Sequence, residues 1–236
     1  MAEPLVLIPG MMCDARLFLP QIAALSAQRA ISVANVTGQD TIEEMARDVL
    51  EAAPERFALL GQSMGGIVAM EVLRRAPERV TRLALVSTSA QAESPAQAAE
   101  REPLIVRAKA GRLDAVIQET MRSDCLAPGP ARPGTLAVVR EMAATLGPDV
   151  FTRQSRALQR RPDQQKTLRM VRAPAMVISG AHDSLTPLRR QEFIADLMPN
   201  ATHRVIGDAG HLPSLETPGA LLEILRDWLG ELLVLR

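Results

Sequence analysis

Short apolar stretches alternate along this chain with segments whose apolar residues recur every three or four positions. The first pattern is typical of buried parallel strands, and the second of amphipathic helices. Their alternation predicts an α/β fold, in which helices flank a mostly parallel sheet of about six strands. The expected strands lie at residues 5–8, 31–36, 57–60, 83–86, 175–178 and 204–206.

Several expected helices carry signals of their own. The pairs Thr186-Pro187 and Thr217-Pro218 each predict a helix start, with threonine as the N-cap and proline as the first helical residue. The segment 64–73 is apolar on nearly all sides, which predicts a helix buried deep in the protein.

One long interval interrupts the alternation. Residues 90–172 are mainly helical in pattern and separate two expected strands by about eighty residues. Connections in a compact domain usually have only a few residues, so such an insertion is better explained as a cap over a site than as a loop without function. We therefore expect an α/β core of residues 1–89 and 173–236, with a helical cap of residues 90–172 inserted before the penultimate strand.

Composition narrows the class of protein. The 236 residues suit one large α/β domain or a domain with a cap. They include 27 basic and 27 acidic side chains with no long run of one sign, so we expect neither nucleic acid nor a membrane surface as a partner. No apolar run reaches the roughly 20 residues that cross a bilayer, and the N-terminus lacks a leader pattern, which predicts a cytoplasmic protein.

The cysteines and histidines form no ligand pattern. Cys13 and Cys125 lie far apart and lack zinc or CxxC spacing, which favours reduced thiols. No glycine pattern for dinucleotide binding opens a helix. We therefore expect neither a metal nor an organic cofactor.

The strongest chemical signal is the sequence Gly-Gln-Ser-Met-Gly at residues 61–65, between an expected strand and the buried helix. Strand, Gly-x-Ser-x-Gly and helix in this order form a nucleophile elbow. The turn holds its serine in a strained conformation that points the hydroxyl out of the sheet, and only very small neighbours permit so close an approach. Ser63 is therefore the candidate nucleophile, and the alternative is an ordinary glycine turn.

A serine hydroxyl needs a base within hydrogen-bond reach, and the chain has three histidines. His211 follows the last expected strand in a glycine-rich loop, where its ring could reach over the edge of the sheet. His182 and His203 are more simply explained as polar loop residues.

The histidine in turn needs a carboxylate that fixes its tautomer and stabilises the imidazolium. Asp183 follows directly from the strand at residues 175–178, which puts its carboxylate at the carboxyl edge of the sheet. Asp208 competes for this role, but it lies only three residues before His211 and is better explained as a turn residue.

Acyl transfer also requires two backbone N–H groups that face the developing oxyanion. We expect them from Met64, directly after the nucleophile, and from Met11, in the loop after the first strand. That loop and the cap should line an apolar cavity suited to an acyl group. The residues expected to bind substrate are Gly10, Met12, Leu104 and Ile105, with Val116 and Ile117 as further apolar lining.

Seven of the arginines in the insertion are candidates to bind a substrate carboxylate, and one or two of them could point inward. The others are expected to be solvated. The seven are Arg101, Arg107, Arg122, Arg153, Arg156, Arg160 and Arg161.

Over nearly its whole length the chain resembles the α/β-hydrolase superfamily, in which the nucleophile, acid and histidine follow one another in this order. The resemblance is to small bacterial members that include esterases, enol-lactone hydrolases, cofactor-free peroxidases and menaquinone-pathway lyases. Two features differ. Pro9-Gly10 stands where the family usually has His-Gly, and the chain begins at what looks like the third strand of the family, which implies a six-stranded sheet trimmed at one edge.

The resemblance and the apolar cavity favour a serine hydrolase that cleaves small or medium carboxylic esters, thioesters or lactones through an acyl-enzyme. Its partner would be a small-molecule acyl substrate. One alternative keeps the triad but uses Ser63 as a base, for elimination or carbon–carbon cleavage of an anionic molecule. Another is a ligand-binding or signalling member of the fold with little turnover. The sequence leaves the oligomeric state open, with a homodimer as one option.

Overall fold

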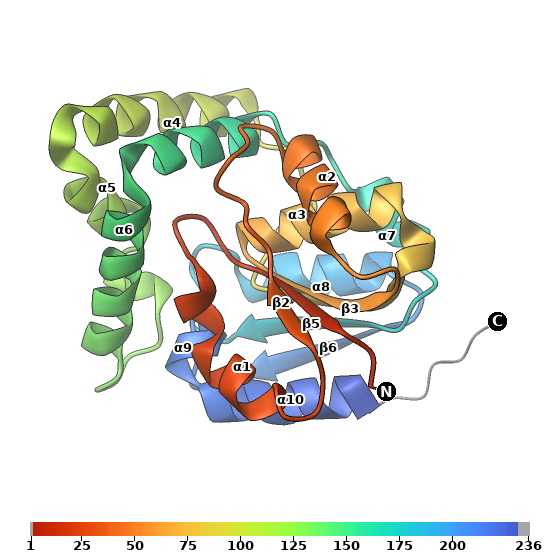
Figure 1. The fold of residues 1–236 in the computed structure, drawn as a ribbon. Coiled ribbons are helices and arrows are strands. Elements are labelled where there is room, and N and C mark those ends of the chain that lie inside the picture. The colour runs from red at the N-terminus through yellow and green to blue at the C-terminus, as the bar shows by residue number, and fades with distance from the viewer. Residues whose placement is uncertain (1, 231–236) are drawn as a thin grey trace.

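The middle layer of the protein is one parallel sheet with the strand order β2-β1-β3-β4-β5-β6, seen in a computed structural model that describes residues 2–230. Helices cover both faces of this sheet (Figure 1). All six expected strands are present. They are β1 (Leu5–Ile8), β2 (Ile31–Val33), β3 (Phe57–Gln62), β4 (Val80–Val86), β5 (Ala175–Gly180) and β6 (Ala201–Ile206).

The strand boundaries differ from the sequence pattern at both edges of the sheet. The strand β2 ends at Val33, although residues 31–36 share one apolar pattern, because Val36 packs into the core beyond the sheet. The strand β6 begins at Ala201, ahead of the apolar residues at its end, and most of it is not buried. Edge strands have only one neighbour, so apolar pattern defines them less well than it defines the buried central strands.

Two groups of helices enclose the sheet. The first lies on one face and includes α1 and α10, and the second lies on the other face and includes α2, α3 and α8 (Figure 1). As expected, α3 is buried along its length from Met64 to Leu73. The helices and turns of the two groups are η1 (Ala15–Phe18), α1 (Leu19–Leu25), α2 (Ile42–Ala52), α3 (Met64–Arg75), η2 (Pro77–Arg79), α8 (Leu188–Leu197), α9 (Pro213–Glu216) and α10 (Pro218–Gly230).

The segment between β4 and β5 is helical. Its helices α4, α5 and α6 pack on one another beyond the ends of β5 and β6, at the left of Figure 1. The long helix α6 changes direction at Gly147, whose φ of 80° is left-handed and favours glycine. The elements are α4 (Pro95–Arg107), η3 (Ala108–Arg112), α5 (Leu113–Thr120), η4 (Ser123–Cys125), α6 (Arg132–Gln159) and α7 (Gln165–Arg169).

The two expected helix starts have different outcomes. The helix α10 begins at Pro218, as the pair Thr217-Pro218 predicts. The helix α8 begins at Leu188 with Pro187 as its N-cap, so the prediction from Thr186 is wrong. The Thr186 hydroxyl instead donates a hydrogen bond to Asp183.

Two further properties concern the chain as a whole. Cys13 and Cys125 are both buried and free, and burial, together with the nearby charge of Asp14, raises the pKa of the Cys13 thiol to about 12. Within residues 2–230, no helix combines the length and the apolar character needed to cross a bilayer.

Glu71 is a charged residue on the buried helix α3. Its carboxylate accepts hydrogen bonds from Arg74 at 2.6 Å, Arg75 at 2.7 Å and Gln164 at 2.8 Å. Burial raises the pKa of Glu71, but these hydrogen bonds outweigh it and hold the pKa below its ordinary value. A carboxylate of this kind stabilises the fold above its unfolded pKa of about 4.3, and the contribution is lost as the pH falls through the lower folded pKa.

We expect Glu71→Gln to reduce the free energy of unfolding by about 2 kcal/mol near neutral pH, since hydrogen bonds to a charged group contribute about this much. The difference from wild type should shrink at an acid pH below the lowered folded pKa of Glu71, where the carboxylate takes up a proton. Urea denaturation at both pH values measures it, with exposed Glu78→Gln as the matched control. A difference that is the same at both pH values would contradict this role for the ionised carboxylate.

Candidate active site

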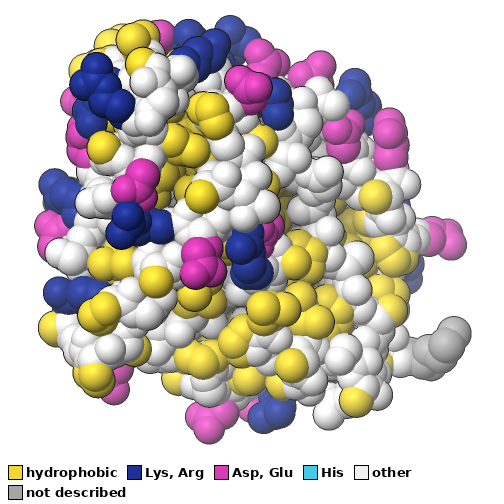
Figure 2. All heavy atoms as spheres, turned by 60° about the vertical axis from the view of Figure 1, so that its left-hand side comes forward, with side chains coloured by type: hydrophobic (Ala, Val, Ile, Leu, Met, Phe, Trp, Pro, Cys, Tyr) yellow, Lys and Arg dark blue, Asp and Glu magenta, His cyan; other side chains and the backbone are white. Residues whose placement is uncertain are grey.

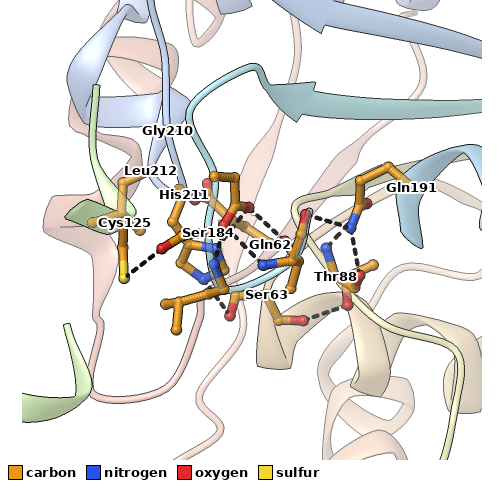
Figure 3. Close-up of polar contacts among 12 residues, drawn as sticks. Gln62, Ser63, Thr88, Cys125, Ser184, Gln191, Gly210, His211 and Leu212 are labelled. Carbon is orange, nitrogen blue, oxygen red and sulfur yellow. Dashed lines mark hydrogen bonds and ion pairs between the residues drawn. The ribbon is translucent and has the colours of Figure 1, made fainter. Parts of the chain in front are cut away.

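Three side chains from distant parts of the chain form a hydrogen-bonded row at the carboxyl edge of the sheet. The Nε2 atom of His211 lies 2.9 Å from Ser63 Oγ, and its Nδ1 atom lies 2.9 Å from Asp183 Oδ2. Figure 3 shows the His211 ring linked to the Ser63 hydroxyl. His211 and Asp183 are 3 % and 4 % exposed, so little water competes for these bonds. The structure thus brings together the three residues that the sequence singles out.

Ser63 lies in a strained turn between β3 and α3. Its φ of 55° and ψ of −120° are rare for a residue with a side chain. The backbone holds the turn at both ends, because the Ser63 N–H donates to the Val86 carbonyl at 2.9 Å and the Ser63 carbonyl accepts from the Thr88 hydroxyl at 2.7 Å. A Cβ atom on Gly65 would lie 2.0 Å from the Ile8 carbonyl oxygen, so only glycine permits this approach of α3 to β1.

Asp183 is held in the ionised form by its surroundings. Its carboxylate accepts the N–H groups of Leu185 and Thr186, each at 2.9 Å, and the Thr186 hydroxyl at 2.5 Å. Burial raises the pKa of Asp183, but the bonds from His211 and Thr186 outweigh burial, so the pKa lies below its ordinary value. An ionised carboxylate only accepts, which requires the proton of a neutral His211 on Nδ1 and leaves Nε2 free to accept from Ser63.

The competing residues lie elsewhere. The Nε2 atom of His203 lies 2.8 Å from Ser179 Oγ within the sheet, and burial lowers the pKa of His203. His182 and Asp208 are exposed. None of the three joins the row formed by Asp183 and Ser63.

Glu216 holds the loop that carries His211. Its carboxylate accepts the N–H groups of the two residues that flank the histidine, Gly210 at 2.9 Å and Leu212 at 2.8 Å. It also accepts the N–H of Ala127, in the insertion, at 2.7 Å. The histidine's own N–H donates to the Cys125 carbonyl at 2.8 Å. The insertion is therefore joined to the histidine loop by one backbone hydrogen bond and by the Glu216 carboxylate.

We expect Glu216→Gln to lower kcat roughly ten- to a hundredfold with a much smaller effect on KM, because a small displacement of the base is costly in the reaction and not in binding. In the glutamine variant, an N–H₂ group replaces one carboxylate oxygen. At least one of the three N–H groups that donate to Glu216 then has no acceptor. Steady-state kinetics on an acyl ester measures the effect. Exposed Glu223→Gln, on α10, is the matched control, and an unchanged kcat in a folded Glu216→Gln variant would contradict this role.

Two buried glutamines also hold the backbone around the triad, and neither was predicted as a site residue. Gln62, directly before the elbow, donates from Nε2 to the His211 carbonyl at 3.2 Å. Gln191 on α8 donates from Nε2 to the carbonyls of Thr88, at 2.7 Å, and Thr186, at 3.3 Å. A polar residue in the fully buried strand β3 was an available signal for Gln62, whereas nothing in the pattern of α8 distinguishes Gln191.

The loop after β1 passes directly beside the nucleophile. A Cβ atom on Gly10 would lie 3.3 Å from Ser63 Cβ. The N–H of Met12 is already used, since it donates to Gln154 Oε1 at 2.8 Å. In contrast, the N–H groups of Met11 and Met64 donate to no other residue in the described part of the chain. These two donors are therefore available to a ligand beside Ser63.

A cavity of about 490 Å³ lies in front of Ser63 and His211. Met11 and Met64, the two residues with available N–H groups, also line it. Its remaining apolar lining is Met12, Ile67, Leu104, Ile117, Met121, Val139, Phe151, Leu158 and Leu185.

The residues expected to bind substrate lie in different places. Met12, Leu104 and Ile117 line the cavity, but Ile105 and Val116 do not. Ile105 and Val116 are 3 % and 0 % exposed and belong to the hydrophobic core. The apolar residues of α4 and α5 therefore line the cavity in some cases and pack into the core in others. The sequence pattern does not distinguish these two positions. Gly10 borders Ser63 without lining the cavity.

Three of the seven candidate arginines line the cavity, namely Arg101, Arg122 and Arg161. The other four do not line the cavity, and each binds another protein group. Their partners are Glu119 for Arg107, the Thr37 carbonyl for Arg153, Glu102 for Arg156 and Asp40 for Arg160. On the face drawn in Figure 2, basic and acidic side chains are interspersed. Among residues 2–230, no three His, Cys, Asp or Glu side chains gather where they could hold a metal ion.

Residues 5–224 match the model of the alpha/beta hydrolase family. The chain belongs to this family. It is 30 % identical over 206 residues to the pimeloyl-[acyl-carrier protein] methyl ester esterase of Aromatoleum aromaticum, with 79 % of each chain covered. It is 26 % identical over 221 residues to the protein of that name from Aliivibrio fischeri, with 82 % of this chain and 77 % of the other covered.

Solved structures of this family have the same fold. A thermophilic esterase from Thermogutta terrifontis is similar with a TM-score of 0.87 and 25 % identity, over 96 % of this chain and 89 % of that one. The enol-lactonase from Burkholderia xenovorans has a TM-score of 0.87 and 24 % identity, over 98 % and 92 % of the two chains. The predicted family and fold are confirmed, and the esterases among these relatives support the prediction of a hydrolase that acts on ester bonds.

Proposed function

We propose that this alpha/beta hydrolase cleaves small or medium carboxylic esters, thioesters or lactones through an acyl-enzyme. The observation that carries the proposal is the unbroken row from Asp183 through His211 to Ser63, with 2.9 Å at each contact, beside an apolar cavity. A serine becomes a useful nucleophile at neutral pH when a base in such a row can take its proton.

In the first half of the reaction, Ser63 Oγ attacks the carbonyl carbon of the substrate while His211 Nε2 takes the hydroxyl proton. Asp183 stabilises the imidazolium that results. The N–H groups of Met11 and Met64 hold the negative oxygen of the tetrahedral intermediate. The intermediate then expels the alcohol or thiol, which leaves with the proton from His211, and Ser63 carries the acyl group.

In the second half, water attacks the acyl-enzyme and gives a proton to His211. The tetrahedral intermediate releases the carboxylic acid, and Ser63 regains its proton from the imidazolium. The cavity lined by Leu104, Ile117 and Phe151 would hold the apolar part of the acyl group. The relatives named as methyl ester esterases support an ester as the substrate.

Two alternatives use the same fold. A lyase or carbon–carbon hydrolase would employ Ser63 as a base, and simple esters would then be poor substrates. A non-catalytic binding protein would not need the Ser63 hydroxyl at all. The free thiols of Cys13 and Cys125 favour a reducing compartment, and we place the enzyme in the cytoplasm.

A fluorophosphonate probe distinguishes these possibilities at the serine. We expect one adduct per chain, located on Ser63 by peptide mass spectrometry, and a burst of product when the protein is mixed with an activated ester. A folded protein that takes no label and turns over no acyl ester would contradict the proposal. Labelling without ester turnover would favour the lyase alternative.

A further inference from the structure

One wall of the cavity contains a nearly buried cluster of charged side chains. Glu93 accepts hydrogen bonds from Arg101 Nε at 3.0 Å and Nη2 at 2.5 Å, and from Arg161 Nη1 at 3.1 Å. The side chains of Glu93 and Arg161 are 5 % and 10 % exposed. All three residues line the cavity that contains Ser63. One carboxylate therefore pairs with two guanidinium groups at the wall of the cavity.

A third guanidinium increases the excess of positive charge at this wall. Arg190, on α8, lines the same cavity, and its side chain makes no ion pair or hydrogen bond with any residue of the described chain. Burial lowers the pKa of Arg161 to about 10; Glu93 raises the pKa, while Arg101 and Arg190 lower it. These effects indicate that Arg101 and Arg190 lie near Arg161 and that the positive charge is not fully compensated.

The other charged groups around the cavity do not restore the balance. Arg122 pairs with Asp124, outside the lining, at 3.0 Å, and Glu119 pairs with Arg107 at 2.7 Å. Glu100 also lines the cavity, but it is exposed to solvent. With Glu100 counted, three arginines face two glutamates. The wall therefore retains an excess of one positive charge.

The cluster also has N–H donors that are not used in hydrogen bonds within the described chain. Arg161 Nε donates to the Gln91 carbonyl at 2.9 Å and Nη1 donates to Glu93, but Nη2 donates to no residue of the described chain. Glu93 and Gln91 hold the planar group in one orientation, so little side-chain entropy remains to be lost when a ligand binds. Fixed, partly desolvated guanidinium groups with free N–H donors suit a carboxylate.

We propose that Arg161, which Glu93 orients, and Arg190 together bind a carboxylate at the far end of the acyl chain, so that the preferred substrates are monoesters of dicarboxylic acids. This inference rests on the proposed ester hydrolysis at Ser63. The apolar lining would hold the methylene groups between the two ends of the acyl chain. Glu93 keeps Arg101 and Arg161 paired when no ligand is present, and its negative charge also weakens the attraction of the wall for an anion.

Matched pairs of methyl esters test the proposal. Monomethyl adipate and methyl hexanoate differ only in a terminal carboxylate against a methyl group, and equivalent pairs cover shorter and longer acyl chains. The quantity of interest is the ratio of kcat/KM for the anionic ester to that for the neutral ester. The pair with the highest wild-type ratio is used for the variants.

We expect Arg161→Gln and Arg190→Gln each to lower this ratio about tenfold, since a charge-assisted hydrogen bond contributes about this factor. Glu93→Gln should raise the ratio severalfold, because it removes a negative charge from the wall. Arg156→Gln, a cap arginine that pairs with Glu102 away from the cavity, is the matched control and should leave the ratio unchanged.

The opposite signs separate binding from structural damage. A purely structural role would impair both esters in every variant, whereas the proposal requires Glu93→Gln and the arginine variants to move the ratio in opposite directions. A ratio that stays within the range of Arg156→Gln, or that falls in Glu93→Gln, would overturn the proposal. If Arg161→Gln or Glu93→Gln does not fold, Arg190→Gln decides alone, because Arg190 has no ion pair to lose. Failure of wild type to hydrolyse either ester would contradict the proposed function itself.

Discussion

Replacement of Ser63 with alanine is expected to reduce kcat for ester hydrolysis by a factor on the order of 10⁶, the largest effect of any single substitution in this chain. The change removes the nucleophile and leaves the cavity and the candidate oxyanion donors in place. KM should change little, because no contact to the acyl chain is lost. Stability should also be retained, since alanine keeps the Cβ atom of serine and the Ser63 backbone groups keep their hydrogen bonds to Val86 and Thr88.

Single-turnover kinetics with an activated ester measures this effect, and the fluorophosphonate label should be absent from the variant. Ser184→Ala is the matched control, because the Ser184 hydroxyl lies near the row but donates to Cys125 Sγ at 3.4 Å (Figure 3). Residual activity of Ser63→Ala within about tenfold of wild type would show that another group attacks the substrate.

Asp183→Asn is expected to reduce kcat about 10⁴-fold without disrupting the fold, the effect that an incorrect histidine tautomer has in a serine protease triad. The Leu185 and Thr186 N–H groups both donate to Asp183 Oδ1, so an asparagine should keep its oxygen there. Its N–H₂ group would then face Nδ1 of His211. That nitrogen would have to accept, which leaves the proton on Nε2 and removes the base that Ser63 requires.

Asp208→Asn is the matched control and tests the competing acid directly. It should leave kcat unchanged, because Asp208 is exposed in the turn before the histidine. Steady-state kinetics with an acyl ester measures kcat for both variants. A loss of activity in Asp208→Asn with Asp183→Asn intact would reverse the assignment of the acid.

The α/β fold could be predicted from sequence because its central strands are buried on both faces. The strands β1, β3 and β5 are fully buried, and a continuous apolar run is the direct signature of that environment. The edge strands β2 and β6 have one neighbour each, and their boundaries were correspondingly wrong. The start of α8 was misplaced because the hydroxyl of Thr186 serves Asp183, a tertiary contact that local capping rules do not include.

The candidate triad could also be located, because each of its residues follows a strand and parallel strands end at one edge of the sheet. The residues that hold the triad and its neighbouring loops in place could not be predicted from the sequence. Gln154 and Glu216 bind backbone N–H groups, and every residue except proline offers such a group, so no sequence pattern points to them. The orientation of Ile105 depended on how α4 packs against its neighbours, which the apolar spacing of one helix does not determine.

The fastening of the insertion to the histidine loop matters for any exchange of lids between related hydrolases. Replacing residues 90–172 with another insertion would remove the Cys125 carbonyl and the Ala127 N–H. The His211 N–H would then lose its hydrogen-bond acceptor, and Glu216 would lose one of its donors. A chimaera would therefore need to retain residues 125–127 from the recipient, or to supply a donor lid with an equivalent backbone segment. In this chain, new specificity cannot be transplanted as a separate module.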